Sequence, residues 1–263
     1  MRITLSLILL YFCNSLNYCQ SGESILDSMF QTIHSIHSIE FTLSSIERFG
    51  EAYRKDEGYI QVKYSPYCVY YKQIIPDQGV EFFYTEGENE GKAILKLNKF
   101  PFLTMNLYPF QMQMRKNRHH TIFETGVMKY MADATINIME KNRNSVEIKY
   151  LGLFKINNIL CYKIVLNNPE YKLLNYIIDD NENLIDISKR YKICDYLVVD
   201  INDNIKKPED IVPGKEIFLP SEYAKTIEFN IDKNLNLPVL IKIYDNIGLF
   251  EQYYFKNLKI NHL

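Results

Sequence analysis

Most of this chain alternates apolar and polar residues, and this period of two restricts its fold more than any other feature. Between residues 40 and 98, glycine- or proline-bearing turns separate the stretches EFTLSSIERFG, GYIQVKYS, CVYYKQI, GVEFFYTEG and GKAILKLN. In the second stretch Ile60, Val62 and Tyr64 share one face, while Gln61 and Lys63 take the other. Because short turns join successive strands in antiparallel order, these stretches predict a β-meander.

Two segments break the alternation and predict helices. Residues 23–39 carry isoleucines and a methionine at helical spacing, which predicts one amphipathic helix of about four turns. Residues 109–144 predict helix in two pieces that are broken near Gly126. Strands resume at SVEIKYLGLF and NILCYKIVL, and again at AKTIEFNID, LPVLIKIYD and FEQYYFKNLKIN. This order of strands and helices indicates the α+β class.

The first twenty residues have the order of an export signal. One positive charge at Arg2 precedes an apolar core from Ile3 to Phe12, which is too short to span a bilayer. No later stretch has the roughly 18 to 20 apolar residues that a membrane-spanning helix needs. We therefore expect residues 1–20 to be a signal peptide and the mature protein, without a transmembrane segment, to be periplasmic or secreted.

Charge and cysteine content exclude several classes of protein. The chain has 30 Lys and Arg against 32 Asp and Glu, so no basic surface for nucleic acid is indicated. Once the signal is removed, Cys68, Cys161 and Cys194 remain, an odd number without the spacing of a metal site or a disulfide framework. Their apolar neighbours favour small buried side chains.

The sequence shows no enzyme motif. It lacks a Gly-x-Ser-x-Gly elbow, a glycine-rich phosphate loop and a His-Glu-x-x-His helix. His34 and His37 have a spacing that can hold a metal, but no Asp or Cys partner stands beside them. His119 and His120, in RKNRHH, form a short basic patch with Arg115, Lys116 and Arg118, and this pattern favours a solvated surface over the alternative, an anion site. We expect a protein that is not an enzyme and that has no cofactor and no metal.

Residues 175–220 interrupt the strands with an order of their own: short strand, helix, turn, helix, Pro-Gly turn and short strand. NLIDISKRYKI forms the first helix, Asn202 follows the second helix, Ile211 and Pro213-Gly214 form the loop and turn, and KEIFLP closes the unit. These residues resemble a LysM domain, the βααβ module that binds N-acetylglucosamine-containing glycans such as peptidoglycan.

This resemblance implies a shallow glycan groove between two loops. Carried over by position, the groove residues are Asn181, Glu182, Asn183, Leu184, Pro208, Asp210 and Ile211. LysM domains usually have Gly-Asp-Thr at the positions of Asn181 to Asn183. We expect the larger side chains of this chain to obstruct close contact between the loop and a sugar. Two interpretations stay open: weak glycan binding, or a LysM-shaped spacer that binds no glycan.

Four stretches outside this unit carry a second resemblance: GYIQVKYSPYCVYYK, GVEFFYTEGENEGKAIL, LYPFQMQMRKNRHHTIFETG and IDKNLNLPVLIKIYDNIGLFEQYYFKNLKIN. They resemble the outer-membrane lipoprotein carrier proteins of the bacterial periplasm, and more closely an uncharacterised family of exported bacterial proteins in which this half-barrel carries an embedded LysM. The resemblance implies an incomplete antiparallel β-barrel wrapped on helices, formed by residues 21–174 and 221–263, with a LysM-like domain at 175–220.

The expected function is that of an exported cell-envelope binding protein that its LysM-like module tethers to peptidoglycan. The alternative is a periplasmic carrier that holds a lipid or lipoprotein in the half-barrel. A curved sheet needs its concave face filled by helices or by ligand, and the sequence leaves both possible. We also expect the module to be separable, so that a host lacking residues 176–220 still folds.

Overall fold

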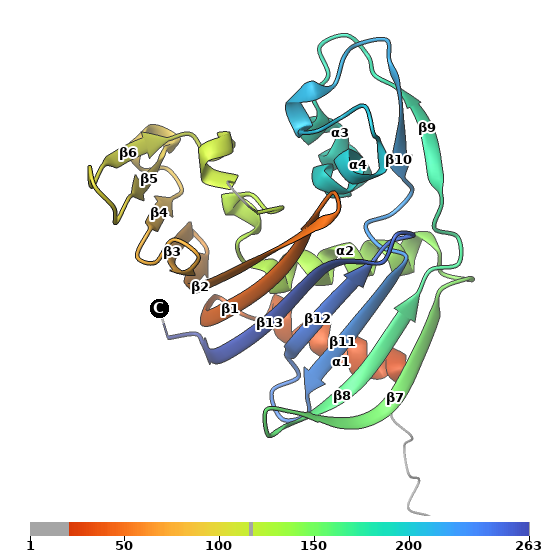
Figure 1. The fold of residues 1–263 in the computed structure, drawn as a ribbon. Coiled ribbons are helices and arrows are strands. Elements are labelled where there is room, and N and C mark those ends of the chain that lie inside the picture. The colour runs from red at the N-terminus through yellow and green to blue at the C-terminus, as the bar shows by residue number, and fades with distance from the viewer. Residues whose placement is uncertain (1–20, 116–117, 263) are drawn as a thin grey trace, which may run out of the picture.

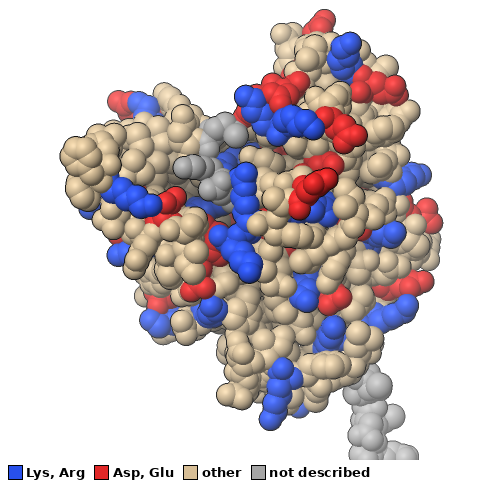
Figure 2. Space-filling view, viewed as in Figure 1, with Lys and Arg blue, Asp and Glu red and all other residues tan. Residues whose placement is uncertain are grey.

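The structure is a computed structural model that describes residues 21–115 and 118–262. The predicted signal peptide lies outside the described residues, so export stays a prediction. Within the described part of the chain, no helix is both long enough and apolar enough to cross a membrane. On the face that Figure 2 shows, Lys and Arg are interspersed with Asp and Glu, in agreement with the balanced composition.

An eleven-stranded antiparallel sheet forms the body of the molecule (Figure 1). Its strands lie in the order β6-β5-β4-β3-β2-β1-β13-β12-β11-β8-β7, so the first long strand pairs with the last one. Their bounds are β1 Ser38–Phe49, β2 Ala52–Tyr64, β3 Tyr67–Ile75, β4 Glu81–Thr85, β5 Ala93–Lys96, β6 Thr104–Leu107, β7 Glu147–Ile156, β8 Ile159–Asn167, β11 Thr226–Asp232, β12 Pro238–Tyr244 and β13 Leu249–Ile260. The sheet is open, with β6 and β7 at its edges, which confirms the predicted α+β class and incomplete antiparallel barrel.

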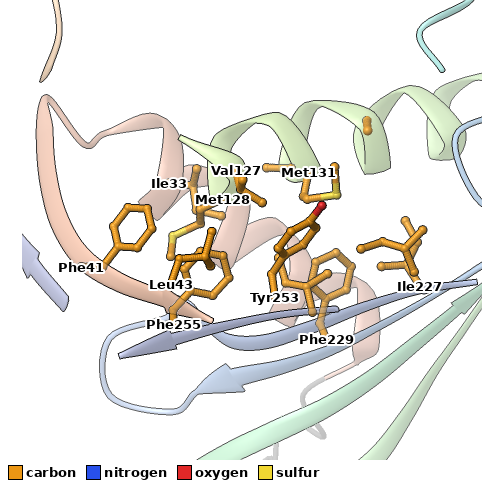
Figure 3. Packing of buried hydrophobic residues seen from close by; sticks show 14 of the residues in the cluster. Ile33, Phe41, Leu43, Val127, Met128, Met131, Ile227, Phe229, Tyr253 and Phe255 are labelled. Carbon is orange, nitrogen blue, oxygen red and sulfur yellow. The ribbon is translucent and has the colours of Figure 1, made fainter. Parts of the chain in front are cut away.

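Two helices, α1 (Gly22–His34) and α2 (Val127–Lys141), cover one face of the sheet. Ser21 caps α1, because its hydroxyl accepts the Ser24 backbone N–H at 3.1 Å. Figure 3 shows the side chain of Met131 in α2 pointing toward Phe229 and Tyr253 of the sheet. All three are buried in one hydrophobic core. The sequence allowed either helices or a lipid to cover this face of the sheet, and in the structure helix side chains cover it.

The residues between β8 and β11 form a βααβ unit at the end of the sheet, and this unit is called the insert below (Figure 1). In it β9 (Leu173–Ile177) pairs antiparallel with β10 (Glu216–Pro220), and α3 (Leu184–Tyr191), α4 (Asp195–Ile201) and the 3-10 turn η4 (Pro208–Asp210) lie between them. This order agrees with the expected βααβ arrangement. Its assignment as a LysM domain stays a prediction.

The insert has a small core of its own and an internal polar clamp. The core residues are Ile178, Leu184, Ile187, Ile193, Val198, Ile205, Ile217 and Leu219. Asn202 is buried just after α4, where its Nδ2 donates to the Phe218 carbonyl and its Oδ1 accepts the Phe218 N–H, both at 2.8 Å. These two bonds fix the end of α4 to β10.

The insert is nevertheless joined to the body through α4. Cys194, Tyr196 and Leu197 belong to the core of the sheet and its helices rather than to the core of the insert. Two buried ion pairs cross the same boundary: Arg115 donates to Asp195 at 2.6 and 2.8 Å, and Arg48 of β1 donates to Asp200 at 3.0 Å. These contacts argue against the expectation that the host folds without the insert.

Two predicted helices differ from the structure. The helix expected over 23–39 ends at His34, because β1 already begins at Ser38. Among the described residues of the 109–126 piece, which exclude 116 and 117, the helical structure consists of the 3-10 turns η2 (Met112–Arg115) and η3 (Ile122–Glu124), so the α-helix predicted there is wrong. The Glu124 carboxylate accepts the Thr121 N–H at 2.8 Å and closes η3 as a local capped turn. The short edge strand β6 was not predicted.

Candidate functional site

A cavity of about 310 Å³ lies between the insert and the body, beside α2 and α3. Its volume is near the lower end of the range for ligand pockets, about 300–1,000 Å³. Tyr130, Asp133 and Ala134 of α2 form one wall, and Ile185, Ser188, Lys189, Lys192 and Ile193 of the insert form the other. The floor consists of Arg115, His119, His120, Thr121, Glu124, Cys194 and Asp195. The cavity therefore exists only where the insert and the body meet.

Two polar atoms at this cavity have no partner. Among the described residues, Arg115 Nε and Ser188 Oγ are buried and make no hydrogen bond, and both residues line the cavity. A buried donor that stays unsatisfied costs about 1–3 kcal/mol. A ligand that brings an acceptor atom into the cavity removes this cost, so the two atoms point to a site for a polar or anionic group.

His119 and His120 lie in the floor of the cavity and are buried, so the prediction that they belong to a solvated basic surface is wrong. His119 Nδ1 lies 2.7 Å from Glu251 Oε1, and His119 Nε2 lies 2.7 Å from the Arg48 carbonyl oxygen. His120 Nε2 lies 2.7 Å from the Tyr253 hydroxyl. The histidines are buried because they pair with polar groups of β1 and β13.

Three carboxylates set the charge of His120. Burial by itself lowers the pKa of His120, but the charges of Glu251, Glu124 and Glu47 outweigh it and raise this pKa to about 9. Burial raises the pKa of Glu124, but His120, the Thr121 N–H and Arg115 together outweigh it and lower this pKa to about 2. His120 is therefore positively charged at neutral pH, and Glu124 is negatively charged.

We expect the stabilising effect of His120 to depend on pH. The pKa of His120 is about 9 in the folded protein, above its ordinary value of 6.5. Its charge therefore stabilises the folded protein fully below about pH 6.5, and this stabilisation is lost as the pH rises through about 9. The stability difference between wild type and His120→Gln, from urea unfolding, should therefore shrink between about pH 7 and about pH 10. His37→Gln, at an exposed position, controls for the loss of a histidine as such. A constant difference for His120→Gln would contradict its assigned charge.

The rim of the cavity carries positive charge. Two charges of the cavity lining have partners: Arg115 pairs with Asp195, and Asp133 pairs with His34, which lies outside the lining, at 2.8 Å. Lys189 and Lys192 stand on the insert side and are exposed. The Lys192 ammonium donates to the neutral Asn137 side chain at 3.0 Å, and the Lys189 ammonium lies 4.3 Å from the centre of an aromatic ring, that of Phe110. Neither contact cancels the charge of the lysine.

None of the seven residues of the predicted glycan groove lines this cavity. The two loops that carry them do meet, because α3 contacts η4. Leu184 is only 1% exposed and packs inside the insert core, so it presents almost no surface to a sugar. Ile211 packs on the outside of the same core and is half-buried.

The other groove residues mainly hold the insert together. Asn181 adopts a left-handed conformation with φ of 68°, which agrees with the turn expected there. Glu182 accepts the Tyr176 hydroxyl at 2.6 Å and also pairs with Arg190. Asn183 caps α3, Pro208 is buried, and Asp210 accepts the N–H groups of the two residues before Pro208. Glycan binding at these residues stays a prediction.

Residues 36–196 match the protein family described as "Protein of unknown function (DUF1571)". The chain belongs to this family. The match runs from the residues before β1 to the start of α4, so it includes the floor of the cavity but not the second half of the insert. The resemblance of the insert to LysM is therefore not tested by this match. No curated protein matches the chain.

Three solved structures are similar to this chain at low sequence identity. Lipoprotein LppX of Mycobacterium tuberculosis is 13% identical, with 92% of this chain and 96% of that chain covered and a TM-score of 0.43. LprF of Mycobacterium bovis is 12% identical, with 90% and 92% covered and a TM-score of 0.42. A LolA superfamily protein of Nitrosomonas europaea is 9% identical, with 92% and 94% covered and a TM-score of 0.34.

Proposed function

We propose that this DUF1571 protein is a non-enzymatic cell-envelope binding protein that holds the anionic head group of an amphiphile in the cavity between insert and body. The proposal rests on one observation. Two donors without a hydrogen-bond partner among the described residues, Arg115 Nε and Ser188 Oγ, line the same cavity as the apolar side chains of Ile185 and Ile193. Small-molecule sites typically combine mostly apolar walls with a few polar groups. This function corresponds to the carrier alternative rather than to the peptidoglycan tether.

Size decides which part of an amphiphile enters. A cavity of about 310 Å³ holds a head group or a short chain, and side chains fill the space between the sheet and its helices. The rest of an acyl chain must therefore lie outside the cavity. Phe110, next to Lys189 on the rim, has its ring centre 5.2 Å from that of Phe123, and both rings are partly exposed. This apolar surface is where the chain of the ligand would lie.

Two measurements test this proposal on the full chain. Mass spectrometry of lipids extracted from the purified protein identifies what it carries. Fluorescence titration then compares a fatty acid with the fatty alcohol of the same chain length. Because the donors and the lysines favour a carboxylate, we expect the acid to bind at least about tenfold more tightly, and equal affinities would refute the anionic head group.

A matched pair of variants locates the site. Ile185→Asp places a negative charge in the cavity wall and should weaken fatty-acid binding at least about tenfold. Ile177→Asp makes the same change in the same unit, at a position on β9 that is 64% exposed and outside the cavity, and should leave binding unchanged. If both variants bind like the wild type, the ligand lies elsewhere.

The second candidate function is glycan binding by the insert. It is favoured by the βααβ order, the clamp formed by Asn202 and the contact between α3 and η4. With Leu184 buried, a sugar could contact only Ile211 and the loop around Asn181, and a single copy has no avidity, so any binding would be weak. Isothermal titration of the full chain with chitin oligomers and muropeptides tests it. An absence of heat at millimolar ligand would leave the insert as a structural unit.

A further inference from the structure

Three side chains from separate parts of the chain meet under the cavity. His119 comes from the segment before η3, Cys194 from the residue before α4 and Glu251 from β13. One ligand atom of each lies within 4.8 Å of the others, and all three residues are buried. Imidazole, thiolate and carboxylate are the three protein groups that bind zinc.

The hydrogen bonds of His119 require a positive centre between it and Glu251. The Arg48 carbonyl can only accept, so the His119 nitrogen facing it, Nε2, carries the hydrogen. In a neutral imidazole the other nitrogen, Nδ1, then has a lone pair, and this lone pair faces the carboxylate oxygen of Glu251 at 2.7 Å. Two acceptors at this distance repel unless a proton or a metal ion lies between them.

The surroundings of the three groups favour a metal ion. Metal-binding histidines usually donate their other N–H to a carbonyl or carboxylate, as His119 does to Arg48. The second oxygen of Glu251 accepts the Tyr223 hydroxyl at 2.8 Å, which fixes the carboxylate. The Cys194 sulfur has a polar contact only at 3.9 Å, to Asp195, so the thiol is weakly held in the described structure. A zinc ion with one thiolate and one carboxylate is neutral, which reduces the cost of burying it. It also cancels the Glu251 charge that raises the pKa of His120, whose Nε2 lies 3.7 Å from Glu251 Oε1, so the charge of His120 described above belongs to the metal-free protein.

We propose that His119, Cys194 and Glu251 form a three-ligand zinc site that fastens the insert to the body. Zinc–ligand distances of about 2.0–2.2 Å in tetrahedral geometry place nitrogen and oxygen ligands about 3.3 Å apart, so Glu251 moves by about half an ångström on binding. Because His119 and Cys194 also line the cavity, the fourth coordination position faces it. The site does not depend on the ligand proposed for the cavity.

Zinc content of the full chain tests the proposal directly. After dialysis against zinc and then against buffer, the wild type should retain about one ion per chain, measured by mass spectrometry, and Cys194→Ser should retain less than about a tenth of that. Cys161→Ser is the matched control, because Cys161 is equally buried but lies on β8 outside the cluster. Cobalt added to the metal-free wild type should give a thiolate-to-cobalt absorption band that Cys194→Ser lacks.

A third measurement needs no variant and therefore does not depend on whether Cys194→Ser folds. The wild-type melting temperature should rise with added zinc and stay unchanged with magnesium, which prefers oxygen ligands. The proposal is overturned if the wild type retains no zinc, or if Cys194→Ser retains as much as Cys161→Ser. In either case a proton alone lies between His119 and Glu251.

Discussion

Replacing Arg115 by methionine is expected to lower the free energy of unfolding by about 3–5 kcal/mol. The side chains of Arg115 and Asp195 are only 3% and 6% exposed, and two hydrogen bonds join them. Without Arg115, the Asp195 carboxylate stays buried with no cation to balance it. Urea unfolding followed by circular dichroism measures the loss as a lower transition midpoint.

Two further variants separate the buried charge from general damage. Arg115→Met combined with Asp195→Leu removes both charges and should recover most of the lost stability, because an apolar pair of similar volume often replaces a buried ion pair without cost. Lys72→Met breaks the pair with Glu81 on the surface, where the lysine is 50% exposed, and should cost less than about 1 kcal/mol. If Arg115→Met also cost less than about 1 kcal/mol, the result would contradict a buried ion pair between insert and body.

The strands of the sheet were predictable because alternation is a local pattern. Ile60 and Val62, assigned to one face from their spacing, are both buried. The pairing of β1 with β13 was not predictable in the same way, since Leu43 opposes Phe255 from the far end of the chain. The likeness to half-barrel carriers predicted an incomplete antiparallel barrel, but it did not state which strands pair, so the β1–β13 pairing comes from the structure.

The cavity was missed because its floor depends on charges that pair over long distances in the sequence. Arg115 and Asp195 are 80 residues apart, and RKNRHH taken alone resembles a surface segment. The sequence nevertheless contained one indication of buried charge, in β1 and β13. Glu47 shares the inward face of β1 with Leu43, and Glu251 shares that of β13 with Tyr253. A carboxylate on an apolar face needs a buried partner, and the histidines and arginines of RKNRHH were candidates, although His119 is 72 residues from Glu47 and 132 from Glu251.

Replacing residues 176–220 with a short Gly-Ser bridge is expected to unfold the body rather than leave it intact. The bridge itself is not the obstacle, because β9 and β10 pair side by side, with Tyr176 opposite Ile217 and Pro220 opposite Leu173, so a few residues span the gap. The excision removes Leu197, which is fully buried, and Tyr196, whose ring centre lies 4.9 Å from that of Phe49. Large core side chains contribute about 2–5 kcal/mol each.

The excision also leaves Arg115 buried without Asp195, which adds about 3–5 kcal/mol, so the total loss approaches the 5–15 kcal/mol by which whole domains are stable. We therefore expect the shortened chain to lack a cooperative urea transition. Adding Arg115→Met to the excision should restore part of the stability, because it removes the unpaired charge. If the shortened chain instead unfolds cooperatively at the wild-type midpoint, α4 contributes nothing to the body, and the insert is the separable module that the sequence predicts.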